Sequence, residues 1–551
     1  MLVKKESFIN IPSFPIAYWV SDRVIDVFTK NEPVEKYADS CIGMRTGDNA
    51  RFLRFWFEVS RNKTGIRLAS AKMAEESKMK WFPYCKGGPF RRWYGNNEYV
   101  VNWEDNGYEI KENTRLVYPQ LGDNLGWKIS NEHYYFKKGI TWSGVTMNTF
   151  GVRSYEEGMI FDSGANGLFV FDDDYYFYFV GLLNTKVIEE LINIINPTVN
   201  TGCGVIAKLP TIISNENKTK IDQLVMQNIS ISKREWDSYE TSWDFNQHPF
   251  ITFKGKTVEE SFGKWNDFTQ NQFIKLKANE EELNSIFIQV YGLQNELTPI
   301  VDEMDVTVRK ADRLGDIKSF ISYAVGCMFG RYSLDEEGLV FAGGKFEPAK
   351  YQKYSVDSDN ILPLVSGAYF EDDIVSRLIE FVNLTFGEET LVENLDYIAE
   401  TLGKKEGETA KEAIRRYFLN DFYKDHLQIY KKRPIYWLFT SGKQKAFNCL
   451  IYMHRYDKST LSRIRTDYLH ELQNRLDAEK KSLLRIIEGG GTAKEISNAK
   501  KELKAIDLKI EELKAYDELL HHMADMQIEI NLDDGVAVNY AKFNGLLAKL
   551  D

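Results

Sequence analysis

The strongest constraint on the fold is a pair of amphipathic segments near the C-terminus, separated by consecutive glycines. Leu472, Leu476 and Leu483 lead up to Gly489–Gly491, and Thr492–Glu495 then forms a capping box, in which a hydroxyl and a carboxylate satisfy free backbone N–H groups at a helix start. Apolar residues follow at steps of three and four: Ile496, Ala499, Leu503, Ile506, Ile510 and Leu513. This pattern predicts an antiparallel helical hairpin over 466–530, which would serve as a spacer, a docking arm or a purely structural element.

The 551 residues are too many for one hydrophobic core, so several domains are expected. The first two hundred residues alternate short aromatic or β-branched runs with Gly and Asn turns, as in "NEYVVNWEDNGYEIK", "GMIFDSGANGLFVF" and "DDDYYFYFVGLLN". This alternation predicts many short strands and a few helices. One helix is expected in "NTKVIEELINIINP", stopping before Pro197, and another in "FTQNQFIKLKANEEELNSIFIQVYGL".

These patterns together predict an α+β chain with five parts. A mixed α/β domain rich in short strands would occupy 1–215, and the polar stretch "TIISNENKTKIDQL" would mark its end. A helical bridge (216–300), a helical C-terminal domain (301–465), the hairpin (466–530) and a tail (531–551) would follow.

Charge is distributed unevenly along the chain, whose net charge is −11. Residues 291–400 hold 21 acidic against 9 basic side chains, whereas residues 401–480 hold 17 basic against 10 acidic. The two blocks would suit one surface for a polyanion and one for a protein partner, or they are ordinary solvated surfaces. The five cysteines lie far apart without a CxxC pair, and no apolar run could span a bilayer, so a cytoplasmic protein without disulfides or a metal site is expected.

Segments of this chain match known catalytic motifs only in part. "FTSGKQK" lacks the first glycine of a P-loop, and "HELQN" is not the HExxH of zinc proteases. Asp105 with Glu109-Ile110-Lys111 is too tightly spaced for a nuclease site, and that segment resembles a strand and turn. We therefore predict no catalytic residues.

Two turn-rich segments combine cations with aromatic rings. "CIGMRTGDNARFLRFW" places Gly47 and Asp48 in a tight turn before Arg51 and Arg54. "WFPYCKGGPFRRWYGNNEYVVNW" places Lys86 and two glycines before Arg91, Arg92, Trp93 and Tyr94. Arginine forks match phosphate oxygens or guanine edges, and the rings could stack on an extruded base. The alternative for the second segment is a β-hairpin with solvated arginines and core aromatics.

Several long segments resemble known DNA-modification enzymes. "GMRTGDNARFLRFW", "TWSGVTMNTFGVR" and "INPTVNTGCGVIAKLP" resemble the target-recognition domain of type IIG and type IIL restriction–modification enzymes. "ISYAVGCMFGRYSLDEEGL" and "RRYFLNDFYKDHLQIYKKRPIYWLFTSGKQKAFNCLIYMHRYD" resemble the C-terminal half of the PglX family, the adenine-specific DNA methyltransferases of BREX phage defence. The resemblance covers nearly the whole chain.

The sequence departs from that family in two respects. It contains neither the glycine-rich S-adenosylmethionine loop nor the Asn-Pro-Pro-Tyr/Phe motif, and "NTGCGVI" differs from the related pattern Asn-Phe/Ile-x-Val-Gly-Asp. The chain is therefore expected to lack the catalytic half, which would bind S-adenosylmethionine and transfer a methyl group to adenine N6. That half would be supplied in cis or in trans.

The resemblance implies that 1–215 recognises double-stranded DNA and that the helical region braces it and holds other BREX proteins. Candidate DNA-binding residues in this module are Thr46, Asn49, Arg51, Arg54, Lys86, Arg91, Arg92 and Tyr94. A second candidate surface in the basic block comprises Lys443, Lys445, Arg455, Arg463 and Arg465. Replacing Arg91 or Arg92 by alanine is expected to weaken DNA binding without unfolding the chain. A non-enzymatic adaptor and a nuclease are the alternative functions.

Overall fold

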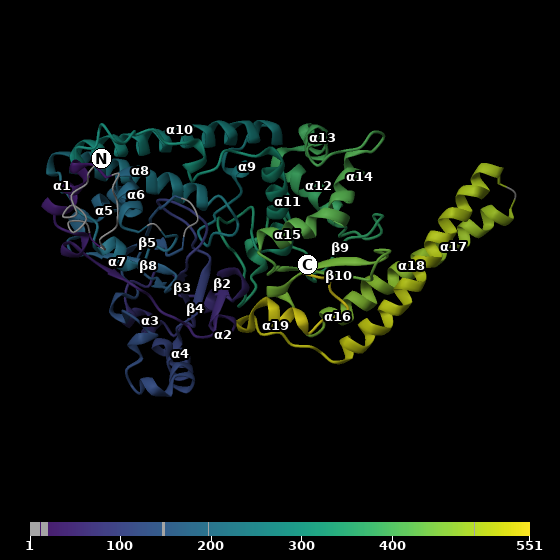
Figure 1. Cartoon of the computed structure of the whole chain (residues 1–551). Helices are drawn as coiled ribbons and strands as arrows, with labels where there is room; N and C mark the ends of the chain where they lie inside the picture. Colours follow the sequence, from purple (N-terminus) through teal and green to yellow (C-terminus); the bar gives the residue numbers. More distant parts are fainter. Residues whose placement is uncertain (1–11, 13–19, 146–148, 197, 490, 551) are drawn as a thin grey trace. The chain divides into compact units, whose positions relative to one another are not determined.

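The computed structural model describes residues 12, 20–145, 149–196, 198–489 and 491–550, which form two compact units (Figure 1). The N-terminal unit comprises Met1–Trp56, Lys63–Ser242 and Asn266–Ala311. The C-terminal unit comprises Phe57–Asn62, Trp243–Trp265 and Asp312–Asp551. The architecture is mixed α and β with small sheets and a largely helical C-terminal region, which confirms the predicted fold class.

Two four-stranded sheets face each other in the N-terminal unit. The first has the order β1 (Ala38–Cys41), β8 (Ala165–Val170), β5 (Gly139–Ser143) and β6 (Arg153–Tyr155), all antiparallel. The second has the order β2 (Leu53–Phe55), β4 (Tyr99–Asn102), β3 (Trp81–Cys85) and β7 (Ile160–Phe161), with β3 and β7 parallel. The rings of Phe161 and Phe169 lie 5.3 Å apart between the sheets, and the Cys85 thiol donates to Thr141 Oγ1 at 3.5 Å.

Helices cover the other face of the first sheet. Ile140, Trp142 and Leu168 point away from the second sheet and share one core with Val180 and Leu191. The covering helices are α5 (Tyr176–Leu183), α6 (Lys186–Ile195), α8 (Asn215–Trp236) and, from Asn266 onward, α10 (Val258–Tyr291). The other helices of this unit are α1 (Asp22–Lys30), α2 (Asn49–Phe52), α3 (Ala71–Ser77), α4 (Glu104–Val117) and α7 (Cys203–Ala207).

Three local predictions for the N-terminal region are confirmed. Gly47 adopts φ +75°, and the Asp48 side chain accepts a hydrogen bond from Arg51 N, so the predicted turn leads into the short helix α2. Helix α6 begins after Thr185, whose hydroxyl accepts from Ile188 N, and ends at Ile195. Pro197 lies outside the described residues. The helix predicted in the segment that begins at Phe268 forms part of α10, which ends at Tyr291.

Two strand predictions are wrong. "YFYFVGLL" forms helix α5, which is buried on nearly every side, and an apolar run of this kind does not show whether it is strand or helix. The segment after Gly107 is also helical. Asp105, Asn106 and Gly107 have left-handed φ values of 46°, 58° and 71°, and Ile110 and Thr114 then face the core four residues apart. The turn was correctly placed, but the residues after it form most of α4.

The C-terminal unit is helical around a small sheet that the sequence did not predict. The antiparallel strands β10 (Tyr436–Thr440), β11 (Asn448–Tyr452) and β9 (Leu362–Pro363) lie in that order, and "SGKQK" forms the loop between β10 and β11. The helices around the sheet are α9 (Pro249–Thr252), α11 (Arg313–Phe329), α12 (Ile374–Phe386), α13 (Leu391–Thr401), α14 (Ala410–Tyr417), α15 (Tyr423–Ile429), α16 (Thr460–Arg463) and α19 (Gly535–Ala541).

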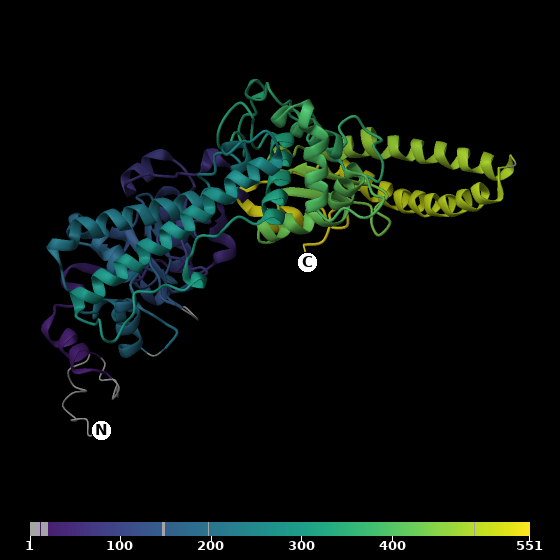
Figure 2. The same cartoon turned by 90° about the horizontal axis from the view of Figure 1, so that it is seen from above.

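The predicted hairpin is confirmed. Helices α17 (His470–Glu488) and α18 (Ala493–Asp525) run antiparallel and side by side (Figures 1 and 2). Thr492 and Glu495 form the capping box, with Thr492 N donating to Glu495 Oε2 at 2.8 Å. Leu476 and Leu513 are buried in a core shared with β10 and β11. Gly490 lies outside the described residues.

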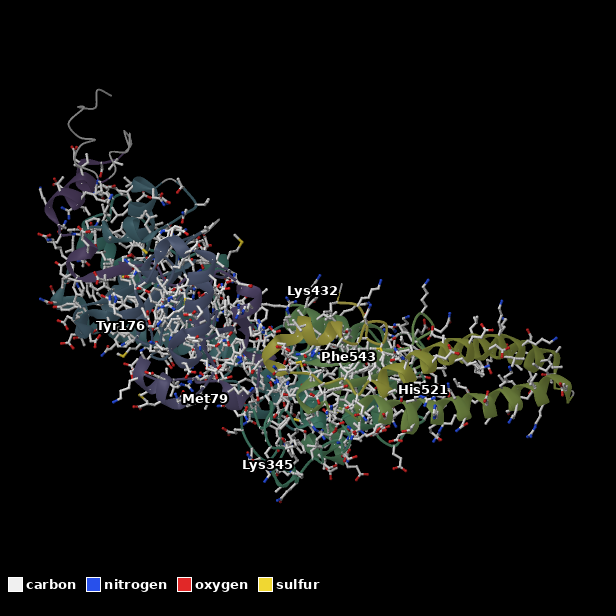
Figure 3. All side chains as sticks on the ribbon, turned by 90° about the horizontal axis from the view of Figure 1, so that it is seen from below. Met79, Tyr176, Lys345, Lys432, His521 and Phe543 are labelled. Atoms are coloured by element: carbon white, nitrogen blue, oxygen red, sulfur yellow. The ribbon has the colours of Figure 1, made fainter. Side chains whose placement is uncertain are left out.

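The hairpin has an exposed outer surface. His521, for example, lies on the solvent side of α18, where it faces Asp525 at 3.6 Å (Figure 3). No described helix of either unit combines the length and the apolar character needed to cross a bilayer.

Candidate nucleic-acid interface

Loops from five parts of the N-terminal unit meet around one cleft of about 530 Å³. They follow β1, follow β3, follow β5, connect β7 to β8 and precede α7. Every loop except the one after β1 contributes at least one glycine to the wall: Gly87, Gly88, Gly144, Gly164 and Gly202. We call this site the glycine cleft. Arg45, Ser143, Ser163, Asn166 and Asn200 are its principal polar residues.

Hydrogen bonds connect the loops around the cleft. Gly144 N donates to the Gly164 carbonyl at 3.0 Å, and Gly88 N donates to Ser143 Oγ at 3.1 Å. A Cβ atom on Gly87 would lie 2.8 Å from the Gly164 carbonyl oxygen, so this approach of two loops requires glycine. Gly202 differs, because a Cβ atom there would meet none of the described residues within 4 Å. The cleft wall is therefore closely packed at Gly87 and open at Gly202.

The chemistry of the cleft suits a polar or anionic ligand. The backbone N–H of Arg45 donates to the Lys128 carbonyl at 2.8 Å. Its guanidinium makes a long contact of 3.5 Å with the Trp127 carbonyl. The Cys203 thiol also lines the cleft, and burial raises its pKa to about 11, so it is neutral at physiological pH. Among the residues that line this cleft, Arg45 is the one with a positively charged side chain.

Part of the predicted DNA-binding set lies on the Gly43–Trp56 segment. Thr46 is buried and donates to Asn49 Oδ1 at 2.6 Å, so this pair shapes the turn before α2. Arg51 is about half exposed, with Nη2 3.5 Å from a Glu109 carboxylate oxygen. Arg54 is half-buried, and its Nη1 donates to the Ala50 and Leu53 carbonyls at 2.7 Å.

The second predicted segment contributes mainly to the interior. Arg91 pairs with Glu235, with a side chain 13% exposed, and Arg92 pairs with Glu280 at 3.4 Å, with a side chain 5% exposed. Both had been expected to be solvated or to meet DNA, but carboxylates of α8 and α10 hold them inside the unit. Tyr94 is also buried, and its hydroxyl accepts from Lys233 Nζ at 3.1 Å. Lys86 is half-buried over the Tyr99 ring.

Most side chains of the predicted basic surface in the C-terminal unit are bound to acidic side chains or to other groups of the unit. Arg465 forms two hydrogen bonds with the Asp517 carboxylate, at 2.7 and 3.2 Å, and Arg463 donates to Asp457 at 2.8 Å. Arg455 donates to the backbone carbonyls of Phe329, Asp357 and Ser358, and its burial lowers its pKa. Lys445 donates to the Leu419 carbonyl and to Asn420, and Lys443 is exposed. These side chains do not form one open cationic surface. DNA contact by any of the predicted residues stays a prediction.

Sequence reasoning missed the glycine cleft and Arg45 as a set. The signal was present in the short pairs Gly87-Gly88, Ser143-Gly144, Ser163-Gly164 and Gly202-Cys203, each of which the structure places next to a strand or a helix. Their positions span more than a hundred residues, so only the tertiary structure brings them together.

Two further features lie in the C-terminal unit. Asp357, Asp359 and Asp372 bring one carboxylate oxygen each within 4.8 Å of the others, although no metal site was expected. Tyr468 Oη lies 2.9 Å from Asp359 Oδ2 and 2.5 Å from Asp372 Oδ2, and we assign no function to this group.

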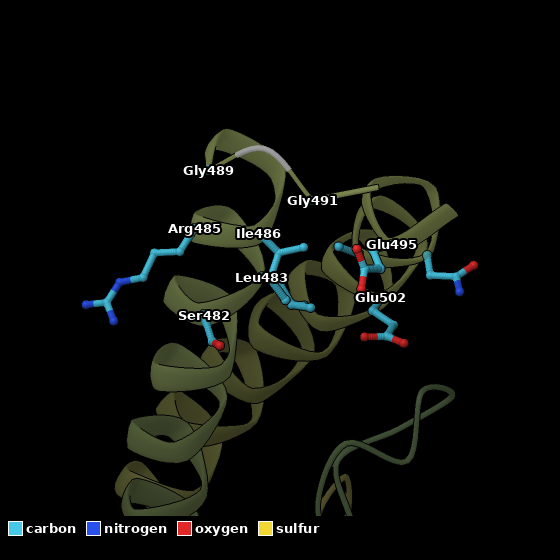
Figure 4. Close-up of a pocket in the computed structure, with 10 residues that line it drawn as sticks. Ser482, Leu483, Arg485, Ile486, Gly489, Gly491, Glu495 and Glu502 are labelled. Carbon is cyan, nitrogen blue, oxygen red and sulfur yellow. The ribbon is translucent and has the colours of Figure 1, made fainter. Parts of the chain in front are cut away.

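The second feature is a cavity of about 630 Å³ near the hairpin tip (Figure 4). Leu483, Ile486 and Ala499 give it an apolar side, and Arg485, Glu495 and Glu502 surround it. Ile486 is 40% exposed there.

In sequence, the chain is similar to part of two adenine-specific methyltransferases. The adenine-specific methyltransferase PglX of Lacticaseibacillus casei (strain Zhang) is 39% identical over 552 residues, which cover 98% of this chain and 45% of that protein. The adenine-specific methyltransferase BrxX of Escherichia coli O9:H4 (strain HS) is 38% identical over 576 residues, which cover 99% of this chain and 45% of that protein. The chain thus spans less than half the length of these relatives. No family model matches the sequence.

Proposed function

We propose that this chain is the DNA target-recognition part of a PglX-like, adenine-specific methyltransferase in BREX phage defence. The observation that carries the proposal is its identity of 38–39%, over nearly its whole length, to part of two adenine-specific methyltransferases. Residues 1–215 would contain the recognition module. The helical remainder would brace that module and hold partner proteins in the cytoplasm.

The glycine cleft supports this proposal on physical grounds. Glycines allow a ligand to approach the backbone closely, and a phosphodiester is narrow, polar and anionic. Arg45 can supply a charge-assisted hydrogen bond to a phosphate oxygen, while Ser163 and Asn166 offer neutral donors. Phosphate contacts of this kind fix the register of a protein on duplex DNA, and side chains in a groove then read the bases.

Methyl transfer would depend on a second part of the enzyme. In this proposal the recognition module places one adenine for extrusion from the duplex, and a catalytic half in cis or in trans binds S-adenosylmethionine and methylates adenine N6. This chain would supply positioning and sequence selection.

The first test is a binding experiment with a purified chain. A fluorescently labelled duplex is titrated at several salt concentrations, and a random duplex library is then passed through repeated binding and sequencing. We expect affinity to fall linearly on a log–log plot against salt, and one short motif to be enriched. Binding that does not respond to salt, or a library without enrichment, would count against target recognition.

A non-enzymatic adaptor is the second candidate function. The exposed Ile486 beside the hairpin-tip cavity favours it, because an apolar side chain on a projecting hairpin can dock a partner protein. If the chain is only an adaptor, it should not bind duplex DNA. Replacing Ile486 by glutamate should then abolish its assembly with the partner protein.

A further inference from the structure

Three arginines lie close together in the N-terminal unit but differ in how their charges are balanced. Arg91 pairs with Glu235 and Arg92 pairs with Glu280. Arg153 is only 2% exposed, and its Nε and Nη2 atoms have no hydrogen-bond partner among the described residues. Of the three, Arg153 is thus the one for which the described part of the unit shows no carboxylate partner.

Arg153 lies behind the glycine cleft. In the β5–β6 pair it stands opposite Thr141, and the cleft residue Ser143 lies two positions further along β5, on the same sheet face. Its guanidinium also neighbours Cys85, which lies two residues before the cleft residue Gly87. Diagonal neighbours of this kind on adjacent antiparallel strands are about 7–8 Å apart, which is short enough for a buried charge to act on the cleft.

A buried cation without a counter-charge destabilises the fold, because it has lost its hydration without gaining an ion pair. Burial accordingly lowers the pKa of Arg153, and the neighbouring Arg91 lowers it further. A purely structural arginine would be expected to have a carboxylate partner, as Arg91 and Arg92 do. The missing negative charge can instead come from a ligand that enters the cleft.

We propose that the glycine cleft binds a phosphate group, and that Arg153 supplies the buried positive charge that balances it. Arg45 would make the direct contact, and Arg153 would act as a positioning residue through the electric field at the cleft floor. This inference rests on the proposed function in one respect only: we take the phosphate to belong to the DNA backbone.

The test uses the purified chain with two probes, inorganic phosphate and a labelled DNA duplex. Arg153→Met removes the charge with little change in volume, Arg153→Lys keeps the charge, and Arg67→Met removes an exposed cation from the same unit. Thermal unfolding is measured in phosphate and in chloride at equal ionic strength, and duplex affinity is measured by fluorescence anisotropy.

We expect phosphate to raise the Tm of the wild-type, Arg153→Lys and Arg67→Met chains but not that of Arg153→Met. Duplex affinity should fall about tenfold in Arg153→Met, corresponding to ~1.4 kcal/mol, and less than about threefold in Arg153→Lys and Arg67→Met. In chloride, the Tm of Arg153→Met should equal or exceed the wild-type value, because an unbalanced buried charge has been removed.

Arg153→Met that keeps the wild-type response to both probes would overturn the inference while leaving duplex binding, and thus the proposed function, intact. A different outcome is that phosphate stabilises the chain only when Arg153 is present, but the chain binds no duplex. That outcome would support the anion site and reject the DNA role. If Arg153→Met does not fold, Arg153→Gln replaces it. Failure of both uncharged variants to fold would assign Arg153 a structural role and end the inference.

Discussion

Filling the glycine cleft from its open side tests the site most directly. Gly202 lines the cleft and has φ −79° and ψ 170°, and apart from its chain neighbours no atom of the described residues lies within 4 Å of the position that a Cβ would occupy. Gly202→Leu therefore places four carbon atoms on the open side of the wall without backbone strain. Gly204 offers the matched control, since it has the same free space but does not line the cleft.

Both variants are expected to fold. Gly202 is the N-cap residue of α7, where glycine is preferred over leucine, so Gly202→Leu should cost at most about 1 kcal/mol. Gly204 lies inside α7, where leucine is a better helix former by up to about 1 kcal/mol.

The loss in binding follows from the number of phosphate contacts. Non-specific complexes with six to ten phosphate contacts have Kd values of about 10⁻⁴ to 10⁻⁶ M, so one contact contributes roughly 1 kcal/mol. Excluding one phosphate from the cleft should weaken duplex binding about fivefold and reduce the salt slope by about 0.9. Excluding two should weaken it about thirtyfold and reduce the slope by roughly 1.8.

Fluorescence anisotropy of a labelled duplex, measured at four or more salt concentrations, gives both the affinity and the slope. Gly204→Leu should match the wild-type chain in both. Equal affinity and equal slope for Gly202→Leu and the wild-type chain would refute the placement of DNA in the cleft, since the leucine would occupy the space that a phosphate needs.

Three further predictions concern stability. Arg92→Ala should lower the free energy of unfolding by about 3–5 kcal/mol, because Glu280 would be left buried and unpaired; an unchanged urea midpoint would contradict the structure. Burial and two neighbouring carboxylates raise the pKa of Asp357 to about 8, so its contribution to stability is complete below about pH 4 and is lost as the pH rises towards 8. Asp357→Asn should therefore flatten the fall in Tm between pH 5 and 9, and a variant with the wild-type pH profile would rule out this assignment. Leu513→Ala should destabilise the C-terminal unit by about 2–5 kcal/mol in urea denaturation, whereas the partly exposed Leu508→Ala should cost less than about 1 kcal/mol; equal losses would show that the hairpin is packed differently.

Local signals account for the parts of the fold that could be predicted. The Thr492 capping box, the heptad residues of α18 and the cap of α6 at Thr185 act over three or four residues, so they are visible in sequence. Helix α5 was missed because its residues are apolar on nearly every side, which removes the periodicity that separates helix from strand.

The sequence showed which types of residue the site would contain, but not which of them lie close together in space. Arginine next to aromatic residues was a correct description of the segment around Arg91 and Arg92, but it gave no sign of their partners. Glu235 lies 144 residues from Arg91, and Glu280 lies 188 residues from Arg92. Because Arg92 is buried and paired with a distant carboxylate, Arg92→Ala is expected to reduce stability, whereas the sequence alone predicted a loss of DNA binding.

The sequence by itself determined the hairpin, the turn before α2 and the mixed α and β character, since each depends on neighbours within a few residues. Only the tertiary structure decided which cations are neutralised and which glycines share a wall. Five loops form the glycine cleft, and Arg153, for which the described residues show no carboxylate partner, lies behind it, because two sheets bring distant strands face to face. Electrostatic balance depends on distance in space, which one-dimensional spacing does not encode.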